Sequence, residues 1–485
     1  MSNRLLSRDR RRKMMSYLRL GGRVLVALIP IALVVFGVRQ YKFSQRAAPL
    51  VAQKEPAVGP HVDTPLLAVR RVPTLVSAPL STADIKAKLA FIAPSVPTGS
   101  CLAVSADGQV VGATNMDQAV IPASNQKVIT AAIALEKLGP DYQFETKIYG
   151  KEVDGTVEDL YVVGGGDPVL ATPKFREASK KFDYYVDTPF TKLEDLLTQL
   201  RKDKGIRVVN GSLIGVGTRY EGDSLLGSWP KSQVSPIGGL VINDTRTSYT
   251  DQLYGLDPAK HAVEQLAATM KDNRIIYNGE PPRSGVLPVD PGEVLASVKS
   301  APLKDIVAAM LTRSENTIAE MLFREIGFKL AGTGSFGVSA QAVTETLASW
   351  NVPMAGVVID DGSGLDRADK LTCGALLAVL SHAGPSGDLA NGLATPGRGT
   401  LAKEFLNSPV KDRLRAKTGT LQGVRSLTGY VSSTPEHSVT FALVLNGVNA
   451  TAQADKLWLM LGDAMASFPT LIDVTAFAPK PAIPG

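Results

Sequence analysis

The feature that most limits the fold of this chain is a change of pattern that interrupts it at residues 146–290. Before this stretch, Gly99–Ala113 predicts a β-hairpin, and apolar residues at helical spacing predict a helix that begins near Ser124. Within the stretch, short alternating runs are broken by Gly, Pro and Asp, as in Val208–Val216. We therefore expect a first domain interrupted by an inserted β-rich or α/β unit.

Helical spacing returns after the insertion. Leu303–Leu330 and Val338–Trp350 are predicted to be helices, Gly423–Val431 and Ser438–Asn446 strands, and Ala452–Phe468 a closing helix. The chain has 485 residues, enough for two or three domains. The expected divisions are a basic tail with an apolar run (1–46), a Pro/Ala-rich tether (47–79), a first domain in two parts (80–145 and 291–475), the insertion (146–290) and a tail (476–485).

The amino terminus combines cations with an apolar run. Eight Lys or Arg residues precede residues 24–38, which have no charged or polar side chain. Fifteen residues span about 22 Å as a helix, short of a hydrocarbon core of roughly 30 Å, which by itself favours a cleaved signal peptide. However, Arg39, Lys42 and Arg46 follow where a small-residue cleavage site would stand. We expect an uncleaved signal-anchor in the cell membrane with the body outside the cytoplasm; a cleaved leader with a secreted or periplasmic body is the alternative.

Composition excludes several classes of protein. Hydrophobic residues make up 44% and charged residues 20% of the chain, which is typical of globular proteins. The net charge is +6, but residues 1–46 carry 11 − 1 = +10, so the rest carries 6 − 10 = −4 and no nucleic-acid partner is expected. Four histidines without a close pair and two cysteines predict no metal site and no cofactor.

The strongest local motif is Ser124-Asn-Gln-Lys127 at a helix start. Residues three apart lie on one helix face, so the lysine amine can reach the serine hydroxyl. A lysine whose pKa is lowered by burial can take the serine proton and so activate a nucleophile. The helix start also offers a backbone N–H to a developing oxyanion. An N-cap serine followed by a surface lysine is the ordinary alternative for an isolated motif of this kind.

Two further motifs follow in the chain. Ser314-Glu-Asn316 is expected midway along a helix, and Lys417-Thr-Gly-Thr420 on the approach to a strand. They add a hydroxyl, a carboxamide and a second ammonium, and Gly419 lets a substrate backbone approach the strand edge. The three motifs in this order are the signature of penicillin-binding proteins and serine β-lactamases.

The surrounding sequence is closer to one family. Gly164-Gly-Gly-Asp-Pro168, Ser300-Ala-Pro-Leu-Lys304 and Asp361-Gly-Ser-Gly-Leu365 resemble the penicillin-binding protein 4 type of D-alanyl-D-alanine carboxypeptidase/endopeptidase, peptidase family S13, over roughly residues 80–470. That family has a large insertion between its first two motifs, as the 314 − 124 = 190 residues suggest here. The resemblance implies an α/β (α+β) fold, with a β-lactamase/transpeptidase-like antiparallel sheet, helices on both faces and the inserted domain.

The resemblance also implies a reaction. The enzyme would remove the terminal D-alanine from peptidoglycan stem peptides through a seryl ester, with cleavage of D,D cross-links left open and β-lactams as covalent inhibitors. Ser124 would be the acylated nucleophile, Lys127 its general base, Ser314 the proton relay, Asn316 the holder of the peptide amide and Lys417 the electrostatic support.

Substrate-binding residues are implied in the same way. Thr418, Gly419 and Thr420 would hold the terminal carboxylate and the substrate backbone, and Arg367 would lie near the pocket and read the donor side chain. The backbone N–H groups of Ser124 and Thr420 would form the oxyanion hole. Gly217 stands where family members often have an acidic residue for the distal amine of the stem peptide, so the third residue of that peptide is left open.

Some questions remain open from the sequence. Cys101 and Cys373 are expected to be buried free thiols, although a body outside the cytoplasm would permit a disulfide. The alternatives to the peptidase are a non-catalytic peptidoglycan-binding protein with a relict site, a β-lactamase and a penicillin-sensing receptor domain.

Overall fold

The computed structural model describes residues 72–230, 232–247, 254–434 and 436–470. The predicted signal-anchor at 24–38, most of the predicted tether and the C-terminal tail lie outside these residues. No helix within the four ranges is both long and apolar enough to cross a membrane.

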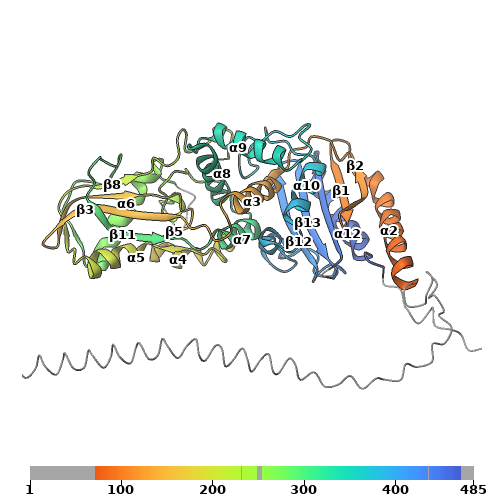
Figure 1. Ribbon diagram of the computed structural model, residues 1–485, viewed down its shortest axis with the longest axis horizontal. Helices are drawn as coiled ribbons and strands as arrows, with labels where there is room; N and C mark the ends of the chain where they lie inside the picture. The colour runs from red at the N-terminus through yellow and green to blue at the C-terminus, as the bar shows by residue number, and fades with distance from the viewer. Residues whose placement is uncertain (1–71, 231, 248–253, 435, 471–485) are drawn as a thin grey trace, which may run out of the picture. The chain divides into compact units, whose positions relative to one another are not determined.

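The first sheet combines strands from both ends of the chain. Its five strands are antiparallel throughout, in the order β12-β13-β14-β1-β2 (Figure 1). Their bounds are β1 Cys101–Ala106, β2 Gln109–Thr114, β12 Leu414–Leu421, β13 Val424–Ser432 and β14 Ser438–Asn446. Strand β1 pairs with β14 on one side and with β2 on the other, so the first strand lies inside the sheet.

Helices cover both faces of this sheet, as the resemblance implies (Figure 1). The side chains of β1 alternate: Cys101 and Ala103 pack in one hydrophobic core, and Leu102 and Val104 in another. The helices of the first core are α3 Gln126–Lys137, α7 Leu303–Arg313, α8 Asn316–Ala331, α9 Phe336–Ser349, α10 Cys373–Ala383 and α11 Asp388–Gly392; those of the second are α2 Val72–Ile92 and α12 Ala450–Ala466. A sheet buried on both faces explains why all six residues of β1 are buried.

Helix α2 corrects the predicted tether. Residues 72–79 were expected to be extended because of their prolines, but they form the start of α2. Ile85, Leu89 and Ile92 pack in the second core and hold this helix against the sheet. Composition alone could not show that tertiary contact.

The second sheet is built from the insertion. Its main path is β10-β8-β4-β3-β11; off this path, the short strand β7 pairs with β4, and β9 pairs with β7. The bounds are β3 Glu145–Val153, β4 Thr156–Val163, β7 Val208–Val209, β8 Leu213–Val216, β9 Ile276–Tyr277, β10 Arg283–Ser284 and β11 Glu293–Lys299; the helices are α4 Pro173–Ser179, α5 Leu193–Thr198 and α6 Pro258–Met270, and β5 Leu170–Ala171 pairs with β6 Thr191–Lys192. Strand β11 pairs with β3, so residues 293–299 belong to this sheet and not to the second part of the first domain, where they were expected.

The predicted helix at 303–330 is in fact two helices. Ser314 ends α7 in the left-handed region, with φ 63°, and Glu315 caps α8 by accepting from the N–H of Ile318. Ser314-Glu-Asn316 therefore lies at a break between helices, where backbone direction changes, and not midway along one. The break brings Ser314 and Asn316 to the lining of the same cavity.

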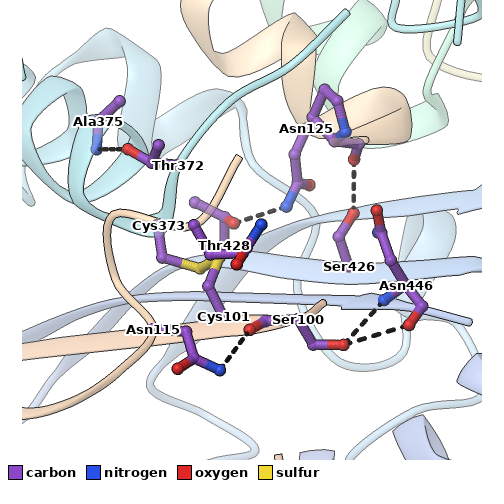
Figure 2. Close-up of a disulfide and its surroundings, with 12 residues drawn as sticks. Ser100, Cys101, Asn115, Asn125, Thr372, Cys373, Ala375, Ser426, Thr428 and Asn446 are labelled. Atoms are coloured by element: carbon purple, nitrogen blue, oxygen red, sulfur yellow. Dashed lines mark hydrogen bonds between the residues drawn. A yellow bond between two sulfur atoms is a disulfide. The ribbon is translucent and has the colours of Figure 1, made fainter. Parts of the chain in front are cut away.

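The two cysteines form a disulfide, contrary to the expected free thiols (Figure 2). Cys101 points to the sheet face that α10 covers, and Cys373 is the first residue of α10. Their Cα atoms are 5.8 Å apart, within the usual range for a disulfide. Cys101 and Cys373 are 272 positions apart in the chain, so the distance between them could not be derived from the sequence.

Candidate active site

The segment around Ser124 is held against strands β13 and β14. Asn446 exchanges two hydrogen bonds with the backbone of Ile121, at 2.8 and 3.1 Å. Ser426 Oγ donates to Pro122 O at 2.9 Å, and Asn125 Nδ2 donates to Thr428 Oγ1 at 2.6 Å, as Figure 2 shows for the labelled partners. These contacts fix the turn that carries Ser124.

The backbone of this turn is unusual. Ser124 lies in a single 3₁₀ turn, Ala123–Asn125, directly before α3. Ala123 has φ 49°, a conformation that non-glycine residues seldom adopt. Gly364 packs against it so closely that a Cβ there would overlap Ala123 O.

Lys127 connects Ser124 with the second motif. Its Nζ lies 3.1 Å from Ser124 Oγ, 2.7 Å from Asn316 Oδ1 and 2.9 Å from Ser363 O. The side chain is 0% exposed. Burial lowers the pKa of Lys127 to about 8, although the carboxylates of Glu320 and Asp361 oppose the shift.

Buried carboxylates hold the loop that supplies Ser363 O. Glu320 accepts from the N–H groups of Gly362 and Ser363, at 3.0 and 2.7 Å. Asp361 accepts from the N–H groups of Ser363, Gly364 and Asp366. Burial, together with Asp361, raises the pKa of Glu320 well above its usual value.

The insertion supports the same region. Asn316 Nδ2 donates to Gln233 O at 2.7 Å, which turns the amide oxygen of Asn316 toward Lys127. Trp229 Nε1 donates to Asp361 Oδ2 at 2.9 Å. The inserted domain therefore contributes contacts that orient side chains of the first domain.

The third motif lies on β12, the edge strand of the first sheet. Lys417 is 0% exposed, and its Nζ donates to Thr418 O at 2.7 Å. Burial lowers the pKa of Lys417 well below its usual value, and the nearby Lys127 acts in the same direction. At Gly419 a Cβ would lie 3.1 Å from Ser124 N, so this position lets the strand approach the serine.

The outer edge of β12 faces the cavity with backbone donors. Ala416 N donates to Ala394 O at 2.9 Å, on the side away from β13. Because backbone direction alternates along a strand, the N–H groups of Thr418 and Thr420 point the same way. The N–H of Thr420 is thus free of the ladder with β13.

The motifs meet at one cavity of about 400 Å³. Its lining residues are Ser124, Gln233, Ser314, Asn316, Leu365, Thr400, Glu404, Thr418, Thr420, Arg425 and Trp458. Lys127 and Lys417 lie beneath this lining. Arg367, two residues after Leu365 in the chain, is not part of this lining. Its guanidinium is exposed and donates to Gln422 O at 3.0 Å. Gly217 follows β8 and is also outside the lining.

Six lining residues were not predicted as site residues: Gln233, Leu365, Thr400, Glu404, Arg425 and Trp458. Most of these residues belong to no recognisable sequence motif. Arg425 could have been predicted, because a hairpin that turns at Gln422-Gly423 places residue 425 opposite residue 420. Within the four described ranges, no cluster of three His, Cys, Asp or Glu side chains is arranged to hold a metal ion.

Comparison with known proteins gives concordant results. The model of the D-Ala-D-Ala carboxypeptidase 3 (S13) family matches residues 87–255 and 237–462. A D-alanyl-D-alanine carboxypeptidase of Actinomadura sp. (strain R39) is 29% identical over 426 residues, which cover 73% of this chain and 78% of that protein.

Solved structures share the fold. Penicillin-binding protein 4 from Haemophilus influenzae superposes with a TM-score of 0.61 at 21% identity, covering 77% of this chain and 97% of the other. The same protein complexed with a novel β-lactam gives a TM-score of 0.55 at 22% identity, with the same coverage.

Proposed function

This chain belongs to the D-Ala-D-Ala carboxypeptidase 3 (S13) family, and from that premise we propose that it is a serine D,D-peptidase of peptidoglycan stem peptides. One observation carries the serine mechanism: a buried amine, Lys127 Nζ, lies 3.1 Å from the hydroxyl of Ser124 at a cavity of about 400 Å³. The pKa of Lys127, lowered to about 8, gives a neutral fraction at neutral pH that can accept the serine proton.

The proposed reaction has two stages. In the first, Ser124 Oγ attacks the carbonyl carbon between the last two D-residues while its proton passes to Lys127, and the oxyanion accepts from the N–H groups of Ser124 and Thr420. As the C–N bond breaks, Ser314 passes its hydroxyl proton to the leaving amine and takes up the proton that Lys127 accepted from Ser124, which returns Lys127 to its neutral form. In the second stage, Lys127 takes a proton from the attacking water, the ester C–O bond breaks, and the proton returns to Ser124 Oγ as the shortened peptide is released.

The other motif residues position the substrate. Asn316, oriented by Lys127 and Gln233, holds the peptide amide. Thr418 and Thr420 offer hydroxyls to the terminal carboxylate, and Lys417 supplies positive potential from beneath the strand when it is protonated. β-Lactams, whose strained amide mimics the scissile bond, would acylate Ser124 in the same way.

Intact-protein mass spectrometry after exposure to a penicillin tests this proposal, with Ser124→Ala as the matched control. We expect a stable adduct on the wild type and none on Ser124→Ala. In a separate assay without penicillin, the wild type should release D-alanine from a peptide ending in D-Ala-D-Ala. Rapid loss of the adduct would instead indicate a β-lactamase. No adduct and no hydrolysis by the folded wild type would favour a non-catalytic wall-binding protein.

We also propose that residues 24–38 anchor the protein in the cell membrane with its catalytic body outside the cytoplasm. The cations before this run and the disulfide between Cys101 and Cys373, which suits an oxidising compartment, support the placement. The full chain should sediment with membranes, and a chain that begins at residue 47 should not. A mature N-terminus after residue 38 would show a cleaved leader instead.

A further inference from the structure

The catalytic cavity has one cation in its lining among the described residues, and that cation is Arg425. Lys127 and Lys417 are both 0% exposed, and their ammonium groups already donate to protein oxygens. A substrate that ends in a free carboxylate would therefore meet the guanidinium before either ammonium.

Arg425 is held in place from two directions. On β13 it lies opposite Thr420 of β12, and its Nη1 donates to Thr420 Oγ1 at 2.7 Å. The guanidinium carbon lies 4.7 Å from the ring centroid of Trp458, a cation–π distance. A planar group fixed by stacking loses little entropy when it binds a ligand.

The same guanidinium retains unused donors. Its Nε is buried and has no hydrogen-bond partner within the described part of the chain. Because this Nε is buried, a ligand in the cavity would meet the Nη groups, of which only Nη1 donates to a protein oxygen in the described residues, and a carboxylate accepts from guanidinium donors in pairs. Thr418 and Thr420, which line the cavity beside it, add two hydroxyls.

We propose that Arg425 binds the free α-carboxylate of the C-terminal D-residue and so makes that carboxylate a condition for efficient cleavage. This inference rests on the proposed function and adds a specificity residue to it. Glu404 is the one carboxylate in the described lining of the cavity. Substrates whose terminus is amidated or esterified lose the interaction.

The test compares two substrates and two proteins. The substrates are an acylated peptide ending in D-Ala-D-Ala and the same peptide with a C-terminal amide; the proteins are the wild type and Arg425→Gln. The wild type should prefer the free acid. Arg425→Gln should lower kcat/KM for the acid by about 10- to 100-fold and for the amide by less than about 3-fold. Arg425→Lys, which keeps the charge but not the planar fork, should lie between them.

Arg415→Gln is the matched control, because Arg415 lies on β12 and bonds Asn391 away from the cavity. It should keep the preference of the wild type. Equal losses for acid and amide in Arg425→Gln would mean that Arg425 only supports Thr420 and Trp458, and a wild type without preference for the acid would also overturn the proposal.

A binding measurement separates this inference from the proposed function. The acid and amide peptides are titrated by calorimetry into Ser124→Ala protein with and without Arg425→Gln, since neither variant can turn them over. Preference for the acid that depends on Arg425 supports the inference even if the wild type shows no hydrolysis and no penicillin adduct, which would contradict the peptidase. Equal binding of acid and amide to Ser124→Ala would contradict the inference alone.

Discussion

The two buried lysines of the active site come from different elements and have different electrostatic surroundings. Lys127, on α3, donates to three oxygens and lies near the carboxylates of Glu320 and Asp361, so its pKa falls only to about 8. Lys417, on β12, donates to Thr418 O and has Lys127 as its charged neighbour, so its pKa falls well below the usual value. Burial is the first cause in both cases, and the neighbouring charges decide how far each shift goes.

This difference indicates different chemistry for the helical side of the site, which contains Lys127 on α3, and the strand side, which contains Lys417 on β12. The helical side keeps a lysine that exchanges its proton close to neutral pH, which is the property of a general base. On β12, burial and Lys127 disfavour the charged form of Lys417, so we expect an anionic substrate to favour its protonation. The two ammonium groups therefore respond to different partners, the serine and the substrate.

The largest expected effect on acylation comes from removing the lysine of the helical side. Lys127→Ala should reduce the second-order rate of acylation by a penicillin by about 10³-fold, because no other amine reaches Ser124 Oγ in the described structure. Stopped-flow or mass-spectrometric acylation rates measure it. Lys137→Ala, at the other end of α3, is the control and should stay near the wild type. A loss below 10-fold in Lys127→Ala would show that Lys127 is not the base.

A smaller effect on acylation is expected from a substitution that disturbs the contact between β12 and the turn that carries Ser124. Gly419→Ala places a methyl group in overlap with Ser426 Oγ, 2.9 Å from Pro122 O and 3.1 Å from Ser124 N. The Ser426 hydroxyl that donates to Pro122 O is then displaced, and the turn that carries Ser124 must shift. Overpacking of about 1–3 kcal/mol predicts a 10- to 100-fold loss of acylation with little change in the pH profile. Gly423→Ala in the adjoining turn tests backbone strain alone, since Gly423 has φ 73° and lies away from Ser124. Unchanged acylation in a folded Gly419→Ala protein would contradict the close approach.

The pH profile sharpens the comparison. Acylation should rise with pH as Lys127 loses its proton and level off above about pH 8. Glu320→Gln removes a carboxylate that, when ionised, favours protonated Lys127, so the pKa of Lys127 should fall and the rising limb should move to lower pH. Glu136→Gln, at the far end of α3, should leave the midpoint in place. A midpoint that rises in Glu320→Gln would contradict this electrostatic account.

The smallest effect concerns Lys417. Because burial holds its pKa low, binding of an anionic peptide should raise that pKa and take up a fraction of a proton. Calorimetry of the Ser124→Ala protein in buffers of different ionisation enthalpy measures the uptake. It should disappear with the amidated peptide and with Lys417→Met, and uptake that persists in Lys417→Met would place the titrating group elsewhere.

The sequence predicts the parts of this site that depend on local pattern. Ser124 and Lys127 are three residues apart on one helical turn. The motif at 417–420 was expected on the approach to a strand, and it lies within β12. The break at Ser314 was missed because apolar residues at helical spacing continue on both sides of it, although Ser and Asn inside a helix are cap formers. The disulfide and the cavity wall at Glu404 and Trp458 depend on distances between remote segments, which no local pattern contains.

The position of β1 inside the first sheet has a consequence for biosynthesis. Cys101 of β1 pairs with Val444 of β14, so β1 leaves the ribosome hundreds of residues before its partner strand is synthesised. The inserted sheet, which lies between them in the chain, can close first from contiguous residues. The catalytic sheet is then completed last, by the carboxyl-terminal strands, and a nascent or truncated chain that lacks β13 and β14 cannot hold the turn that carries Ser124. We therefore expect activity only after synthesis has passed β14.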